Sequence, residues 1–184
     1  MQQYEWMATA AFGLEGVTAR ELSHLGIEAK AENGGARFYG TLEDAFRANL
    51  HLRCADRVVL VVGRFPATSF EALFEGVRAL PWENFIGEHT RFPVTGKCAR
   101  SQLMSVRDCQ AITKKAIVER LKAHYHTSWF LEDAECVSID VALHGDVAQL
   151  TINASGDALN RRGYRTWNGE APLRETLAAA LVLQ

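Results

Sequence analysis

The sequence predicts an α+β protein in which two successive units each combine helices with strands. Three observations support this class. Strand and helix patterns alternate along the first 65 residues, two turns rich in glycine each separate a pair of strands, and a long basic helix lies near the middle. The chain has 184 residues, and 48% of them are hydrophobic, so its length and composition allow two small cores.

The first unit is predicted from the order of its elements. In chain order these are a strand over Tyr4–Thr9, a helix over Gly13–Leu25, strands over Ile27–Ala31 and Arg37–Tyr39, a helix over Thr41–Leu52 and a strand over Arg57–Phe65. Gly26 suits the end of the first helix, Asn33-Gly34-Gly35 suits a hairpin turn, and Asp44 stands at the capping-box position. This order is that of the ferredoxin-like fold.

The second unit begins after Pro66. Its predicted elements are a helix over Ser69–Leu80, a strand over Arg91–Lys97, a helix over Ser105–Tyr125 and two strands over Val137–His144 and Val147–Asn153. Gly145-Asp146 marks the turn between the last two strands. The first helix carries Phe70, Leu73, Phe74 and Val77 at helical spacing, which predicts a core face rather than a base-stacking platform. The turn that contains Trp82 is predicted to be a packing plug.

The end of the chain has a different composition. Residues 156–172 are polar, basic and aromatic without a period, which predicts a linker. An apolar helix is predicted over Leu173–Leu183. Because no partner for this helix is evident in the rest of the chain, we expect it to begin a further domain.

Positive charge is concentrated between Arg91 and Lys122. This segment holds eight basic and two acidic side chains, a net charge of +6, in a chain whose total is −2. At roughly 100° per residue, the helix turns an apolar side toward the core and gathers its lysines on the opposite side. A solvated surface is one interpretation. Lys97 and Arg100 precede the helix N-terminus, however, where backbone N–H groups favour an anion, so a phosphate-binding face is the alternative.

Other site classes are not indicated. The four cysteines are scattered without a CxxC pair, which favours free thiols in a reducing, cytoplasmic location over disulfides or a zinc site. His124 and His126 are two residues apart on a helix and point in different directions, so no metal is expected there. The chain contains no apolar run near the ~20 residues of a membrane helix, and residues 1–12 do not form a secretory signal.

Several stretches together resemble one family. They are Phe12-Gly13-Leu14-Glu15, Gly34-Gly35-Ala36-Arg37-Phe38, the run from Asn49 to Val58, Ser101-Gln102-Leu103, Lys114-Lys115-Ala116-Ile117-Val118, the run from Leu159 to Arg165, and the run from Ala171 to Ala180. In order and spacing they resemble the bacterial THUMP-domain RNA methyltransferases, a group that modifies guanine N2 in large-subunit (23S) ribosomal RNA and is often described as adenine-specific DNA methylases.

This resemblance implies the domain plan of the chain. Residues 1–65 would form a ferredoxin-like unit, 66–155 a THUMP RNA-binding domain, 156–172 a linker, and 173–184 the first helix of a Rossmann-like methyltransferase domain that uses S-adenosylmethionine. The family's donor loop and Asn/Asp-Pro-Pro motif would lie after Gln184, so no catalytic residue is assigned. We expect these 184 residues to bind no cofactor and to be inactive alone.

The residues and the resemblance together predict where RNA binds. The phosphate contacts would come from Lys97, Arg100, Arg107, Lys114, Lys115 and Lys122, helped by Arg161, Arg162 and Arg165. Tyr164 and Trp167 would either stack on an unpaired base or pack against the following domain. The expected partner is RNA, most of all large-subunit rRNA, with neither DNA nor membrane; the oligomeric state is not predicted.

Three other functions remain open on the sequence. The chain could be an RNA-binding adaptor without an enzyme, or part of another THUMP enzyme such as a tRNA methyltransferase or a thiouridine synthase. It could also be a protein-docking module, because residues 1–90 carry a net charge of −4 while residues 91–184 carry +2.

Overall fold

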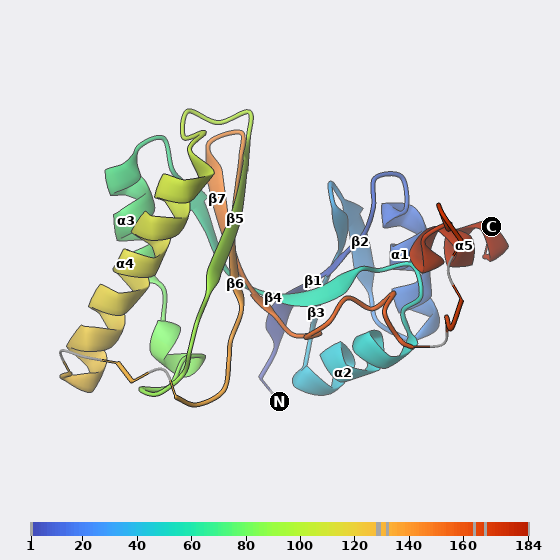
Figure 1. The fold of residues 1–184 in the computed structure, drawn as a ribbon, viewed down its shortest axis with the longest axis horizontal. Coiled ribbons are helices and arrows are strands. Elements are labelled where there is room, and N and C mark those ends of the chain that lie inside the picture. The colour runs from blue at the N-terminus through green and yellow to red at the C-terminus, as the bar shows by residue number, and fades with distance from the viewer. Residues whose placement is uncertain (1, 128–129, 132, 164, 168, 184) are drawn as a thin grey trace. The chain divides into compact units, whose positions relative to one another are not determined.

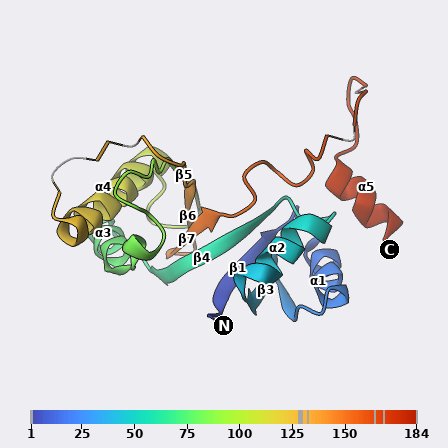
Figure 2. The same ribbon diagram turned by 90° about the horizontal axis from the view of Figure 1, so that it is seen from below.

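The structure is a computed structural model that describes residues 2–127, 130–131, 133–163, 165–167 and 169–183. It divides into two compact units, residues 1–60 with 153–184, and residues 61–152 (Figures 1 and 2). Strand β4 (Arg57–Pro66) contributes residues to both units. The α+β class predicted from the sequence is confirmed.

The first unit has the predicted ferredoxin-like order. Its elements are β1 (Tyr4–Thr9), α1 (Glu15–His24), β2 (Ala29–Glu32), β3 (Gly35–Gly40), α2 (Leu42–His51) and the start of β4. The strands lie side by side in the order β2-β3-β1-β4. The pairs β2–β3, β1–β3 and β1–β4 are antiparallel. Helix α1 packs on β2 and β3, and α2 packs on β1 and β3, so the helices cover the sheet.

Large side chains fill the core between this sheet and its helices. Trp6 is 2% exposed, stacks on Phe38 with ring centroids 6.5 Å apart, and donates its indole N–H to the Gly40 carbonyl at 3.1 Å. The predicted capping box of α2 is present, because Thr41 and Asp44 each accept a hydrogen bond from the other's backbone N–H. Local signals therefore placed this helix correctly.

The second unit contains α3 (Phe70–Ala79), the short 3₁₀ helix η1 (Trp82–Asn84), β5 (Val94–Ala99), α4 (Val106–Tyr125), β6 (Ile139–His144) and most of β7 (Val147–Asn153). Its strands follow the order β4-β7-β6-β5, with β5 parallel to β6. Helices α3 and α4 pack against each other, and α4 lies on β5 (Figure 1). The β6–β7 hairpin turns at Gly145 and Asp146, both with positive φ, as predicted.

Two details of this unit differ from the sequence predictions. Strand β5 begins at Val94 rather than Arg91, because Arg91 makes only an isolated bridge with Cys136 and Pro93 has no N–H to donate. Phe70 was predicted to be core but is 39% exposed, since it is the first residue of α3. Trp82 is the predicted plug: it is fully buried and donates to the Val77 carbonyl at 2.7 Å.

An ion pair fixes η1 against α4. Arg120 donates through Nε and Nη2 to the two carboxylate oxygens of Glu83, at 3.0 and 2.5 Å. These hydrogen bonds lower the pKa of Glu83 to about 2. Arg120 belongs to the basic segment of the sequence, but this pair commits its guanidinium group to the fold.

We therefore expect an acid-dependent loss of stability that depends on Glu83. A carboxylate whose pKa is lower in the folded state than its ordinary value of 4.5 stabilises the fold above that value and loses its contribution as the pH falls toward 2. Urea unfolding of the wild type and of Glu83→Gln, measured from pH 7 to pH 2, should converge across this range. A constant difference between the two proteins at every pH would contradict the assignment.

The C-terminal helix α5 (Glu175–Val182) has a partner in the chain that was not evident from the sequence. Ala180 is 1% exposed and forms a small core cluster with Leu14, Val17 and Cys54 of the first unit. The larger side chains Leu177 and Leu181 are 39% and 62% exposed. The small side chain of Ala180 allows the helix to approach this cluster closely. Within the described ranges, no helix has the length and apolarity that a membrane span requires.

Candidate nucleic-acid interface

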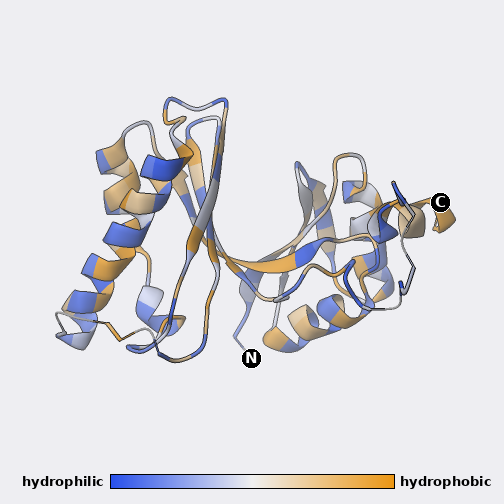
Figure 3. Ribbon diagram, viewed as in Figure 1, coloured by the Kyte–Doolittle hydropathy of each residue, from blue (hydrophilic) through white to orange (hydrophobic). Residues whose placement is uncertain are grey.

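Helix α4 has the two sides that the sequence predicted. Its buried side consists of Cys109, Thr113, Ala116, Ile117 and Leu121. Arg107 and Lys115 are exposed on the opposite side, and Lys122 is half-buried there. Figure 3 shows hydrophilic and hydrophobic bands alternating along this helix. We call Arg107, Lys115 and Lys122 the α4 cationic face.

Cation–π contacts with two phenylalanine rings hold basic side chains on and beside this face. The Lys115 Nζ lies 5.8 Å from the centroid of Phe74 on α3, and the Arg78 guanidinium lies 5.7 Å from the same centroid. Lys114 Nζ lies 5.3 Å from the centroid of Phe92. These contacts orient the side chains. Arg78 also forms an ion pair with Glu75 on the same helix, at 2.7 Å. Arg78 was not singled out from the sequence, although its position one turn after Phe74 was a usable signal.

Lys97 does not share this surface. Its neighbours in β5 face α4: the Sγ atoms of Cys98 and Cys109 are 3.8 Å apart, and a Cβ on Gly96 would come within 3.2 Å of Gln110. Successive side chains of a strand point to opposite faces, so Lys97 points away from α4. The structure thus separates Lys97 from the α4 cationic face.

Arg100 lies in a loop that is firmly tied to the β6–β7 turn. The Asp146 carboxylate accepts the Gln102 backbone N–H at 2.7 Å, and the Asp146 N–H donates to Ser101 Oγ at 3.0 Å. Arg100 itself is exposed and has a φ of +52°, which is uncommon for a residue with a side chain. The loop leads to Ser105, the N-cap of α4, whose Oγ accepts a hydrogen bond from the Asp108 N–H at 3.4 Å.

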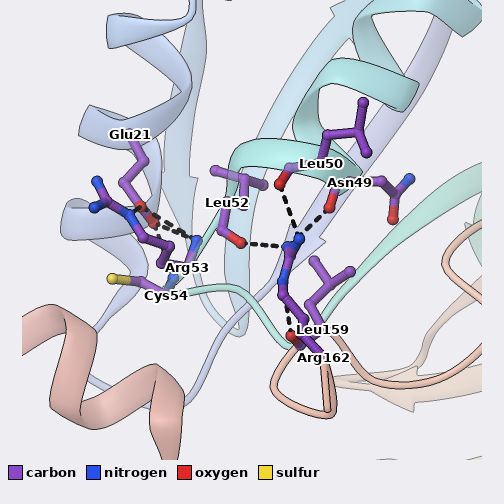
Figure 4. Close-up of polar contacts among 8 residues, drawn as sticks. All are labelled: Glu21, Asn49, Leu50, Leu52, Arg53, Cys54, Leu159 and Arg162. Atoms are coloured by element: carbon purple, nitrogen blue, oxygen red, sulfur yellow. Dashed lines mark hydrogen bonds and ion pairs between the residues drawn. The ribbon is translucent and has the colours of Figure 1, made fainter. Parts of the chain in front are cut away.

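The three predicted arginines after β7 belong to the first unit, and they differ in their surroundings. Arg162 donates to the carbonyls of Asn49, Leu50 and Leu52 at 2.8, 2.8 and 2.7 Å (Figure 4). Arg165 pairs with Glu175 at 2.9 Å and donates to the Leu173 carbonyl at 2.8 Å. Arg161 is exposed, and the described residues offer its side chain no hydrogen-bond or ion-pair partner. Tyr164 lies outside the described residues, and Trp167 is 83% exposed.

Comparison with known proteins gives the two units their family. The RlmL ferredoxin-like domain matches residues 5–59, and the THUMP domain matches residues 67–153. One relative is YpsC of Bacillus subtilis, which is named as an RNA methyltransferase. It is 46% identical over 184 residues, which are 99% of this chain and 48% of YpsC. The ribosomal RNA large subunit methyltransferase K/L of Methylococcus capsulatus is 38% identical over 98% of this chain and 25% of its own length.

The chain belongs to the family of THUMP-domain RNA methyltransferases. It corresponds to the N-terminal part of these proteins and spans about half the length of YpsC. A crystal structure from Listeria monocytogenes, titled a predicted N6-adenine-specific DNA methylase, is 48% identical with a TM-score of 0.95 over 100% of this chain and 48% of that chain. A methyltransferase complexed with SAH, SMU.472, is 41% identical with a TM-score of 0.93 over 100% and 49%.

A groove lies between α3 and α4 of the THUMP domain. It has a volume of about 470 Å³ and is lined by Glu75, Arg78, Ala79, Glu119, Arg120 and Ala123. This lining is mostly charged and contains no aromatic ring, unlike the predominantly apolar lining of most small-molecule sites. Among the described residues, no cluster of three or more His, Cys, Asp or Glu side chains could hold a metal ion.

The cysteines of both domains are free thiols, as the sequence predicted. Burial raises the pKa of Cys54 in the ferredoxin-like unit to about 12. Burial also raises the pKa of Cys109 in the THUMP domain to about 12. Thiols with such pKa values stay protonated at neutral pH and are poor nucleophiles, so we assign both to packing.

Proposed function

We propose that this chain is the RNA-binding portion of an enzyme that methylates guanine N2 in 23S ribosomal RNA. The observation that carries the proposal is the α4 cationic face on a THUMP domain, because it presents Arg107, Lys115 and Lys122 on one side of one helix. Relatives named ribosomal RNA large subunit methyltransferase K/L support rRNA as the substrate class.

In this proposal the THUMP domain positions RNA and performs no chemistry. Arg107, Lys115 and Lys122 contact phosphates, and Arg78 extends the contact to α3. Phosphate contacts fix the register of a nucleic acid without reading its sequence. Arg100 and Arg161 are further proposed contacts, since both are exposed. Lys114, beside Phe92, lies at the edge of the same helix surface.

The methyl group would come from S-adenosylmethionine bound by the rest of the enzyme, as the SAH complex of SMU.472 suggests. This chain's task would be to hold the RNA so that the target guanine, extruded from any duplex, stays within reach of the catalytic domain. Such positioning makes the reaction between the guanine and the methyl donor effectively unimolecular, which lowers the entropic part of its barrier.

The proposal is tested by filter binding of this chain to 23S rRNA fragments, tRNA and duplex DNA of matched length. With four phosphate contacts, the slope of log affinity against log salt would be roughly −3, so affinity for rRNA should fall about 60-fold between 50 and 200 mM salt. Equal binding of tRNA would favour a tRNA-modifying THUMP enzyme. The absence of salt-dependent RNA binding would favour a protein-docking module instead.

A second assay tests the chemistry. Full-length enzyme and labelled S-adenosylmethionine should transfer label to 23S rRNA, and nuclease digestion should release it as N2-methylguanosine. RNA binding without transfer by the full-length protein would favour the adaptor alternative. Transfer to another base would leave the RNA-binding role intact and overturn the assignment of guanine N2.

A further inference from the structure

Helix α2 ends without the residue that usually completes a helix. The last turn of a helix leaves four carbonyls without partners inside the helix, and a following glycine often helps to satisfy them. After His51 the chain continues with Leu52-Arg53-Cys54, so this glycine is missing. Arg162 supplies the hydrogen bonds instead, from 110 residues further along the chain (Figure 4).

The guanidinium group of Arg162 is nearly fully used by these contacts. Its Nη1 donates to Leu50, its Nη2 to both Asn49 and Leu52, and its Nε to the Leu159 carbonyl at 3.0 Å. A guanidinium group has five N–H donors, so four are occupied. Its positive charge also lies at the negative end of the helix dipole. Only one N–H donor of Arg162 is therefore left to bind a phosphate.

The loop that Arg162 contacts is held from its other side by a buried carboxylate. Glu21 on α1 is 7% exposed and accepts the backbone N–H groups of Arg53 and Cys54, the latter at 2.9 Å (Figure 4). The Leu52 carbonyl and the N–H groups of Arg53 and Cys54 therefore each have a partner of complementary charge. A loop fixed in this way is a rigid base for the segment that carries Arg162.

The segment between β7 and α5 is attached to this base at several further points. Ser155 Oγ donates to Asn49 Oδ1 at 2.6 Å, and the Leu159 N–H donates to the Asp56 carbonyl at 2.8 Å. Arg174, just before α5, pairs with Asp56 at 2.9 Å. These contacts make the segment a strap on the ferredoxin-like unit rather than a free linker.

We propose that Arg162 is a positioning residue that clamps the segment 153–163 to the C-terminal end of α2, so that α5 and the catalytic domain start from a fixed place. The inference rests on the proposed function, and it changes the role of Arg162 from an RNA contact to a structural clamp. Arg161, its exposed neighbour, keeps the proposed contact with RNA.

The adjacent arginines provide a matched pair of variants. Arg162→Ala and Arg161→Ala remove the same charge one residue apart. In this 184-residue chain, amides of residues 159–183 should exchange hydrogen about tenfold faster in Arg162→Ala and at the wild-type rate in Arg161→Ala. In the full-length enzyme, kcat at saturating rRNA should fall by roughly 10- to 100-fold in Arg162→Ala while the RNA Kd stays within twofold, because misplacement affects the reaction step.

Arg162→Lys separates geometry from charge. Lysine keeps the charge at the end of α2 but cannot donate to three carbonyls in a planar fork, so its kcat and exchange rate should lie between wild type and Arg162→Ala. All variants are compared well below their thermal midpoints. If Arg162→Ala does not fold, Ser155→Ala, which removes one strap contact, should show the same changes in weaker form.

Two results would overturn the clamp. The first is unchanged exchange of residues 159–183 in Arg162→Ala. The second is a loss of RNA affinity in Arg162→Ala as large as that in Arg161→Ala, with normal kcat. Because hydrogen exchange requires no RNA, it decides the clamp even if the methylation substrate proposed above is wrong.

Discussion

RNA affinity should fall about 100-fold at 0.1 M salt when Lys115 and Lys122 are both replaced by glutamate, because the variant loses two phosphate contacts and gains two repulsive charges. The two lysines are seven residues apart on the same side of α4, and neither belongs to its buried side. The salt slope should become shallower by about 1.5 units, which filter binding at four salt concentrations measures.

Equal changes of charge elsewhere provide the controls. Arg20→Glu with Lys30→Glu alters the net charge equally but on exposed residues of the ferredoxin-like unit, and affinity should change less than threefold if general attraction is minor. Lys97→Glu tests the other face of the THUMP sheet and should also have little effect. A large loss in Lys97→Glu with a small loss in the α4 double variant would move the RNA to that opposite face.

Local signals explain why most elements could be predicted from the sequence. The Asn33-Gly34-Gly35 turn is one example, since Gly34 has a φ of +89°, which glycine adopts without steric cost. The Thr41–Asp44 capping box is another, because both partners lie within one turn. Such features depend on a few neighbouring residues, so their chemistry is visible in sequence order.

The side to which a charged residue points is set by distant contacts, and the sequence did not show it. Lys97 seemed to belong with the α4 lysines, but the packing of Cys98 against Cys109 turns it to the other face. Arg162 looked like part of a basic linker, yet its partners are carbonyls of a helix 110 residues earlier. The sequence shows which side chains are charged, but the partners that each of them contacts depend on the tertiary fold.

The same limit applies to α5 and to Arg120. No partner for α5 was evident from the sequence, but Ala180 packs against Leu14 and Val17. Arg120 counted toward the basic segment, although its guanidinium group makes two hydrogen bonds to the Glu83 carboxylate. A count of basic residues therefore overstated the cationic surface, and the α4 cationic face contains fewer side chains than the segment from Arg91 to Lys122.

The largest effect on stability is expected for Glu21→Ala, which should reduce the free energy of unfolding by roughly 3–5 kcal/mol. The Glu21 side chain is 8% exposed, and its carboxylate accepts the Arg53 N–H at 3.2 and 3.3 Å and the Cys54 N–H at 2.9 Å. Alanine would leave both N–H groups without their acceptor, and each unsatisfied buried donor costs about 1–3 kcal/mol. A small domain has only about 5–15 kcal/mol in total, so this loss is severe.

Urea unfolding followed by circular dichroism measures the effect, with Glu28→Ala as the control. Glu28 is an exposed glutamate a few residues after α1, and its replacement should change stability by less than about 0.5 kcal/mol. Glu21→Gln keeps one oxygen acceptor without the charge, so its loss should be about half that of alanine, since hydrogen bonds to charged groups are roughly twice as strong as neutral ones. If Glu21→Ala and Glu28→Ala unfolded at the same urea concentration, the Glu21 carboxylate would not be what holds the loop after α2, and the base on which Arg162 is fastened would need another explanation.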